Sequence, residues 1–148
     1  MENGKIRDNQ ITASTQHNYG HRAPNGRLNF RAGSGRTGAW SSLRNDRNQW
    51  LQVDFQRSTI ITGISTQGRT DCCNQFIQSY TISFSDDGKN FRSYKPGGML
   101  KVFRGNSDRS SIVNRVVTPS IKARFIRIHP RVFHHHISMR AEFYGCSY

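Results

Sequence analysis

The sequence contains no long hydrophobic run. No apolar segment approaches the ~20 residues that a transmembrane helix needs, and the opening residues, MENGKIRDNQ, lack the apolar stretch of a signal peptide. N-x-Ser/Thr sequons are also missing, so glycosylation gives no indication of the compartment. We therefore expect a chain that does not itself span a membrane.

Sequence motifs of catalysis are missing as well. The chain has no G-x-S-x-G, no H-E-x-x-H and no glycine-rich phosphate loop. We predict that it is not an enzyme and that it needs no cofactor. The run His134-His135-His136 is reminiscent of a metal site, but three consecutive residues on a strand point to alternating faces. We therefore predict a structural or surface role for these histidines and no metal site.

Acidic residues are scarce. Nine Asp and Glu stand against 22 Lys and Arg, which gives a formal net charge of +13. A cation of this size favours nucleic acid, acidic phospholipid or sulfated glycan as a partner. The basic residues are dispersed along the whole chain, and no nucleic-acid-binding motif accompanies them. We therefore predict that nucleic acid is not the partner.

Large aromatic side chains compensate for a low apolar content. Only 34% of the residues are hydrophobic, but nine Phe, five Tyr and two Trp can fill a core. A chain of 148 residues has the usual size of one domain and can bury roughly two-thirds of its unfolded surface. We predict a single domain over residues 1–148, with Trp40 and Trp50 in the core rather than in a ligand site.

The apolar pattern is that of β-strands. Residues 50–55 and 80–84 alternate apolar and polar side chains, as half-buried strands do. The second of these runs through a turn at 86–90 into 91–94, which predicts a β-hairpin. Further strands are predicted at 60–65, 100–103, 112–117, 124–129 and 137–144. Short strands separated by turn residues predict an all-β sandwich or barrel.

Two further features concern polar residues. Asp54 lies in the first predicted strand and is expected to pair with a basic residue such as Arg127.

Residues 15–46 show no strand pattern and are rich in Gly, Asn, Ser and Arg. Long irregular segments in a domain are usually binding loops or disordered.

The three cysteines, Cys72, Cys73 and Cys146, leave an odd count. An odd number in a secreted protein suggests a partner outside the chain, whereas a cytosolic protein would hold three free thiols. Adjacent Cα atoms lie ~3.8 Å apart, which is shorter than the usual disulfide span of ~4.4–6.8 Å. A strained vicinal bridge between Cys72 and Cys73, two free thiols, and pairing with another chain all remain open.

Several phrases of the sequence, taken in order, resemble the discoidin or coagulation factor V/VIII C-type domain family. They are MENGKIRDNQITAS, NQWLQVDF, ITGISTQGR, SYTISFSDDGKNF, VFRGNSDR, IKARFIRIHP and HISMRAEFYGC. The match covers nearly the whole chain. The resemblance implies a jelly-roll β-sandwich of about eight antiparallel strands, related to galactose-binding domains, with ligand-binding loops called spikes at one end.

The resemblance also implies a pairing for Cys146. Family members usually carry a cysteine shortly before the MENGKI-like phrase, bonded to the one that closes the YGC phrase. The chain begins inside that phrase, so the partner of Cys146 is expected upstream in a longer parent protein. Such a bridge persists in an oxidising compartment, so we expect the parent to be extracellular or on the cell surface.

Carried over by position, the spikes are residues 16–22, 41–47 and 69–75. We predict that the ligand-binding residues are His17, Asn18, Tyr19, His21 and Arg22 in the first spike, Leu43, Arg44 and Asp46 in the second, and Arg69, Asp71, Cys72, Cys73 and Asn74 in the third. The resemblance implies two binding modes. Coagulation-factor members insert apolar spike tips into membranes, and lectin or receptor members hold a sugar or peptide.

The composition of the spikes favours the second mode. Tyr19 and Leu43 are the only apolar candidates at the tips, and a tip needs several buried apolar groups, each worth ~1.5–3 kcal/mol, to anchor in a membrane. Tyr, His, Asn, Asp and Arg suit a glycan better, because they offer a ring to stack on and directional polar groups. We predict a module for adhesion or ligand capture that binds a glycan or acidic glycoconjugate. Anionic phospholipid is the alternative, followed by an extracellular matrix protein such as collagen.

Overall fold

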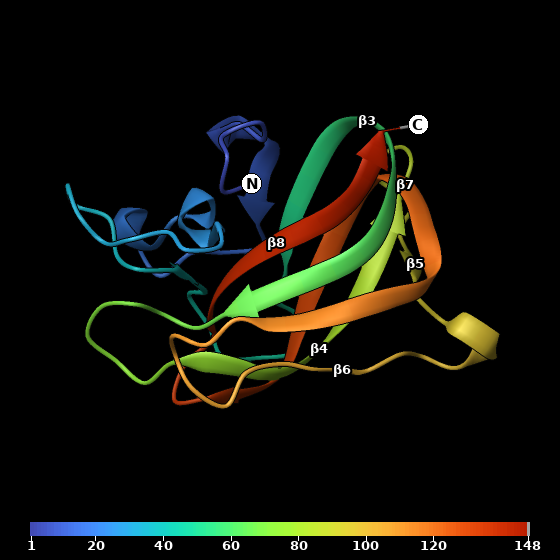
Figure 1. Ribbon diagram of the computed structural model, residues 1–148. Coiled ribbons are helices and arrows are strands. Elements are labelled where there is room, and N and C mark those ends of the chain that lie inside the picture. The colour runs from blue at the N-terminus through green and yellow to red at the C-terminus, as the bar shows by residue number, and fades with distance from the viewer. Residues whose placement is uncertain (148) are drawn as a thin grey trace.

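The fold is built almost entirely from antiparallel strands. The structure is a computed structural model that describes residues 1–147, and Figure 1 shows the strands wrapping around a shared interior. The strands are β1 (Ile11–Ala13), β2 (Trp40–Ser41), β3 (Leu51–Gln67), β4 (Phe76–Ser85), β5 (Arg92–Ser93), β6 (Phe103–Arg104), β7 (Val113–His134) and β8 (Ser138–Ser147). The four short 3-10 helices are η1 (Asp8–Gln10), η2 (Tyr19–His21), η3 (Ala23–Gly26) and η4 (Pro96–Gly98). The all-β class with eight antiparallel strands is confirmed within these residues.

The two longest strands, β3 and β7, belong to both layers of the sandwich. The first part of β3, residues 51–54, pairs with β1 on one side and with residues 125–128 of β7 on the other. The second part, residues 59–67, pairs with residues 113–123 of β7 and with β8. A register shift separates the two parts, and Gln56 lies there with φ 64°. A bulge of this kind bends a strand, so one chain segment can enter both layers.

The bends explain where the predicted strands differ from the observed ones. The predicted strands 50–55 and 60–65 are two halves of β3, and 112–117 and 124–129 are two parts of β7. The polar residues at each bend are the same residue types that end a strand, so the sequence pattern indicates two strands where the backbone continues. The hairpin at 86–90 is confirmed, because β5 pairs with β4 across it. The strands β1 and β2 are too short to show a pattern.

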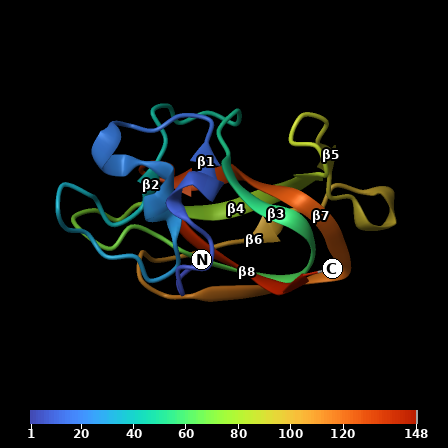
Figure 2. The same cartoon turned by 90° about the horizontal axis from the view of Figure 1, so that it is seen from above.

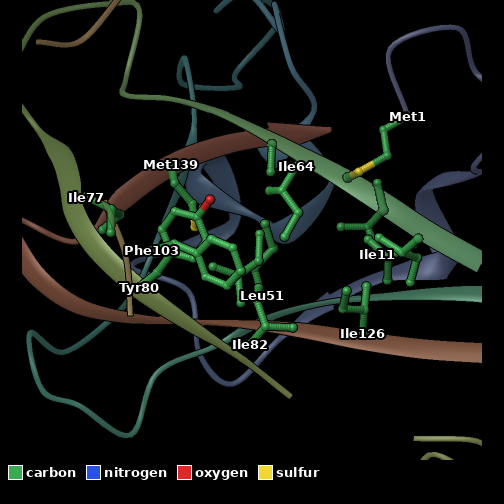
Figure 3. Packing of buried hydrophobic residues seen from close by; sticks show 14 of the residues in the cluster. Met1, Ile11, Leu51, Ile64, Ile77, Tyr80, Ile82, Phe103, Ile126 and Met139 are labelled. Atoms are coloured by element: carbon green, nitrogen blue, oxygen red, sulfur yellow. The ribbon is translucent and has the colours of Figure 1, made fainter. Parts of the chain in front are cut away.

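The interior is filled by aromatic and branched side chains from both layers. The rings of Tyr80 and Phe103 stack in its centre with their centroids 5.3 Å apart, and Figure 3 shows Leu51 and Ile82 beside them. Trp40 is fully buried, which confirms its predicted core position. The predicted core position of Trp50 is wrong, because this side chain is only half-buried and the guanidinium of Arg127 covers its ring.

Asp54 pairs with a basic residue, as predicted, but the partner is not Arg127. Asp54 instead accepts two hydrogen bonds from the guanidinium of Arg124, at 2.8 and 3.0 Å. Arg127 is directly opposite Gln52 in the register of β3 and β7, donates to its side-chain oxygen at 2.8 Å, and covers the ring of Trp50. The register decides which cation reaches the carboxylate.

The long loops gather at one end of the molecule. Figures 1 and 2 both place the segment with η2 and η3 and the loop between β3 and β4 on the side away from η4. Residues 15–46 are thus ordered loops rather than a disordered segment, and β2 lies within them. No helix within residues 1–147 has the length and apolar character needed to cross a bilayer.

Candidate functional site

The first spike, residues 16–22, is a short turn held by Asn18. The side-chain oxygen of Asn18 accepts from the backbone N–H of Gly20 at 2.9 Å and lies 2.7 Å from Nδ1 of His21. The exposed fraction of Tyr19 is 74%, and the guanidinium of Arg22 lies 4.1 Å from the centre of its ring. The turn therefore presents one exposed aromatic ring with a cation on one of its faces.

The second spike, residues 41–47, contains two exposed side chains and one that is hydrogen-bonded to its own neighbours in the chain. Leu43 is half exposed, and Arg44 is also exposed. Asp46 is used locally, because it accepts from the backbone N–H of Asn48 and from the side chain of Gln49. These hydrogen bonds hold the pKa of the Asp46 carboxyl below its usual range.

The third spike, residues 69–75, is closed at its base. The backbone N–H of Arg69 donates to the carbonyl of Gln75 at 3.0 Å, and the guanidinium of Arg69 donates to both carboxylate oxygens of Asp71. The tip contains a disulfide bond between Cys72 and Cys73, so of the alternatives left open by the sequence the structure contains the vicinal bridge. Cys72 and Asn74 are exposed, and Cys73 is half-buried.

Asp71 joins the third spike to the rest of the loops. Burial acts to raise the pKa of its carboxyl, but hydrogen bonds from Arg69 and from the backbone N–H of Gly38 outweigh this and lower the pKa. The backbone oxygen of Asp71 also accepts from Arg109 at 2.7 Å. Its carboxylate therefore serves as an ionised anchor for the loop.

A pocket of about 160 Å³ lies where the three spikes meet. It is lined by His17, His21, Ser41, Arg69, Gln75 and His136. The ring of His17 makes edge-to-face contacts with His21 and His136, at centroid distances of 4.9 and 5.8 Å. The structure thus brings together three of the predicted ligand-binding residues, namely His17, His21 and Arg69.

The other predicted residues are not among those that line this pocket. Asn18 and Asp71 orient His21 and Arg69 through hydrogen bonds. The remaining members of the predicted set are Tyr19, Arg22, Leu43, Arg44, Asp46, Cys72, Cys73 and Asn74. Their part in binding stays a prediction.

Three lining residues, Ser41, Gln75 and His136, were not among the predicted ligand-binding residues. Ser41 and Gln75 lie at the ends of predicted spikes, and their polar side chains were a usable signal. His136 lies just before β8, and no sequence signal links it to the spikes. Tertiary pairing brings it there, because Ser41 of β2 pairs with Ser138 of β8.

A hydrogen-bonded chain of side chains supports the pocket floor. The hydroxyls of Ser41 and Ser138 lie 2.6 Å apart, and Ser138 donates to the side-chain oxygen of Gln75 at 2.9 Å. The same oxygen accepts from Arg69 at 3.2 Å. The side-chain oxygen of Gln75 therefore joins Arg69 to the pair of serine hydroxyls.

The histidine run does not form a metal site in this part of the molecule. His134 stacks on Phe76, His135 is exposed with φ 65°, and only His136 reaches the pocket. Among residues 1–147, no group of three or more His, Cys, Asp or Glu side chains is arranged to hold a metal ion. Cys146 is exposed with a free thiol. Its predicted partner lies outside the chain, so that bridge stays a prediction.

Comparison with known proteins identifies close relatives of the chain. The F5/8 type C domain family matches residues 10–143. Dog coagulation factor VIII is 39% identical over 150 residues, which cover 99% of this chain and 6% of the relative. The human EGF-like repeat and discoidin I-like domain-containing protein 3 is 38% identical over 157 residues, covering 99% of this chain and 32% of the relative. The chain thus spans a small part of these relatives.

Solved structures share the fold. Wild-type discoidin II from Dictyostelium discoideum has a TM-score of 0.83 and 34% identity, over 91% of this chain and 53% of that one. The family 32 CBM from C. perfringens NanJ, solved in complex with galactose, has a TM-score of 0.58 and 17% identity, over 92% of this chain and 91% of that one. The second likeness concerns the fold alone.

Proposed function

This chain belongs to the F5/8 type C domain family, and on that basis we propose that it is a non-enzymatic extracellular or cell-surface module that binds glycans at its spike end. The observation that carries the proposal is the pocket that the three spikes share. Its lining is polar, since it combines a guanidinium, an amide, a hydroxyl and imidazoles. Directional polar groups beside an exposed aromatic ring are suited to sugar hydroxyls and to the apolar face of a sugar ring.

Arg69 is the side chain best placed to bind the sugar. Three of its five N–H groups donate to Asp71 and Gln75, which fixes the orientation of the guanidinium. Two N–H groups remain to donate to a ligand. A preorganised donor loses little entropy on binding, which is an advantage for a small ligand. The sugar-bound fold neighbour from C. perfringens supports the proposal only as an example of this fold serving as a sugar-binding module.

The test compares two variants that change the net charge equally. Arg69→Gln removes the oriented guanidinium, whereas Arg57→Gln removes an exposed arginine outside this pocket. On a glycan array and in titrations with the sugars it identifies, Arg69→Gln should weaken binding about ten-fold or more, because a hydrogen bond to a charged group is worth about 1.5–3 kcal/mol. Arg57→Gln should bind like the parent. Equal loss in both variants would indicate a diffuse charge effect and no specific pocket.

Anionic phospholipid is the second candidate ligand. The exposure of Tyr19 and Leu43 at the same end of the molecule favours it, and nearby arginines could each add about 1 kcal/mol at an anionic surface. Sedimentation with vesicles that contain phosphatidylserine, compared with phosphatidylcholine alone, separates the two functions. If the parent binds the charged vesicles and no glycan, the membrane function replaces the glycan function.

A further inference from the structure

The lining of the pocket contains one guanidinium and no carboxylate. Asp71 beside it is an ionised carboxylate, but Arg69 donates to both of its oxygens, at 2.6 and 3.2 Å. The charges of Arg69 and Asp71 offset each other, so any added proton on the pocket histidines gives the site a net positive charge.

His136 has a hydrogen-bond partner at each ring nitrogen. The side-chain oxygen of Asn45 accepts from the backbone N–H of Ile137, so its amino group is the one that faces Nδ1 of His136 at 3.2 Å. Nδ1 is therefore an acceptor, and Nε2–H donates to the carbonyl of Ser42 at 2.8 Å. Both ring nitrogens of His136 are therefore engaged within the protein, and its ring forms part of the pocket lining.

His21 keeps one ring nitrogen for a ligand. The oxygen of Asn18 accepts from the backbone N–H of Gly20, so Nδ1–H of His21 is the donor to it and Nε2 is left over. The charged and titratable groups that face His21 are Arg69, His17, His136 and Asp71.

The state of His21 at neutral pH follows from these neighbours. Burial, and after it the charge of Arg69, lowers the pKa of His21, while Asp71 acts in the opposite direction. His21 is therefore neutral near pH 7.4. A bound anion would offset the repulsion from Arg69 and raise the pKa again, so protonation and anion binding favour each other.

We propose that the pocket holds the anionic group of an acidic glycan, a sulfate ester or a carboxylate, between Arg69 and the imidazolium form of His21, beside the ring of His17. The affinity for such a glycan then rises as the pH falls from neutral to mildly acidic values. Binding is accompanied by proton uptake on the imidazole of His21. This inference rests on the proposed glycan function and adds to it the chemical class of the ligand and its pH dependence.

The probes are galactose 6-sulfate and galactose, titrated at pH 7.4 and pH 5.5 at constant ionic strength. For the parent, the affinity for galactose 6-sulfate should rise about ten-fold at the lower pH, because a charge-assisted hydrogen bond replaces a neutral contact. The affinity for galactose should stay the same. In NMR titrations, the imidazole pKa of His21 should rise when galactose 6-sulfate is bound.

The variants separate the pocket histidines from the others. The double variant His17→Asn/His21→Asn keeps an amide donor towards Asn18 but removes both imidazole rings, so it should lose the pH response to galactose 6-sulfate. His135→Asn changes an exposed histidine outside the pocket, at a φ of 65° that Asn adopts readily, and should behave like the parent. Far-ultraviolet circular dichroism and thermal unfolding would verify that each variant is folded.

Each outcome separates the inference from the proposed function. If galactose and its sulfate bind equally at both pH values, or if the double variant keeps the pH response, the inference is wrong and the glycan function stands. If neither sugar binds at either pH, both fail. Inorganic sulfate should compete poorly; competition as strong as that of galactose 6-sulfate would mean a simple anion site and would overturn the glycan part of the inference.

Discussion

His129 shows how a single residue couples this fold to pH. It lies on β7, and its Nε2 is 2.6 Å from the hydroxyl of Ser83 on β4. Burial, with a smaller contribution from Arg127, lowers the pKa of His129 to about 4. An unfolded histidine takes up its proton near pH 6.5. Between these two pH values the unfolded state binds more protons, so the free energy of unfolding falls as the pH is lowered.

The variant His129→Gln should be less sensitive to acid than the parent. The parent should lose about 2 kcal/mol at pH 5 relative to pH 7.5 through His129, because the folded state excludes a proton that the unfolded state binds. Urea unfolding at both pH values measures this difference. His21 acts in the same direction and is common to both proteins. His135→Asn is the control, and a pH slope in His129→Gln equal to that of the parent would contradict the prediction.

The third spike shows how elements are positioned by close backbone contact. Gly38, which precedes β2, approaches this spike so closely that a Cβ atom there would lie 2.0 Å from the hydroxyl of Thr70 and 2.8 Å from the backbone nitrogen of Asp71. The backbone N–H of Gly38 donates to Asp71, and its carbonyl accepts from Thr70. The absence of a side chain at Gly38 therefore determines where Arg69 lies.

Gly38→Ala should displace the third spike. The methyl group must push away backbone atoms, so we expect a loss of about 1–3 kcal/mol in stability and at least ten-fold weaker glycan binding. Thermal unfolding and glycan titration measure the two effects. Gly63→Ala on β3 is the matched control, because its Cβ would meet neighbours only at 3.5 Å. Parent-like binding by Gly38→Ala would show that the position of this spike is not needed.

The whole molecule carries a formal net charge of +13, and its basic residues are dispersed along the chain from Lys5 to Arg140. Such a field attracts acidic ligands over distances of about the Debye length, roughly 8–10 Å at 0.1–0.15 M salt. It increases the rate of encounter, whereas the contacts in the pocket determine how long the ligand stays. Charge and pocket therefore have separable effects on binding.

Association of an acidic glycan should depend strongly on salt. Raising the salt from about 0.05 to 0.5 M should lower the association rate by about ten-fold or more and change the dissociation rate much less. Surface plasmon resonance with an immobilised sulfated oligosaccharide measures both rates. A neutral oligosaccharide serves as the comparison and should show little dependence. If salt changed only the dissociation rate, the charge would act through contacts in the pocket and not through the rate of encounter.

Much of this protein follows from its sequence. Alternation of apolar and polar residues is a local property, so the all-β class, the hairpin at 86–90 and the buried Trp40 could be predicted. The resemblance to the discoidin family predicted which segments of the sequence are spikes. Within these segments, His17, His21 and Arg69 do line one pocket. The types of side chain in the spikes, and the excess of positive charge, were likewise visible without any coordinates.

The tertiary structure decided what depends on register and on contact between distant segments. Because of the register between β3 and β7, Asp54 forms its ion pair with Arg124 rather than with Arg127. Buried Arg140 donates to the carbonyls of Phe30, Gly68 and Arg109, and so joins three loops that the sequence separates. Pairing of β2 with β8 brought His136 to the pocket. These contacts depend on which hydrogen bonds form between segments that are distant in the sequence. A local pattern of residues does not contain that information.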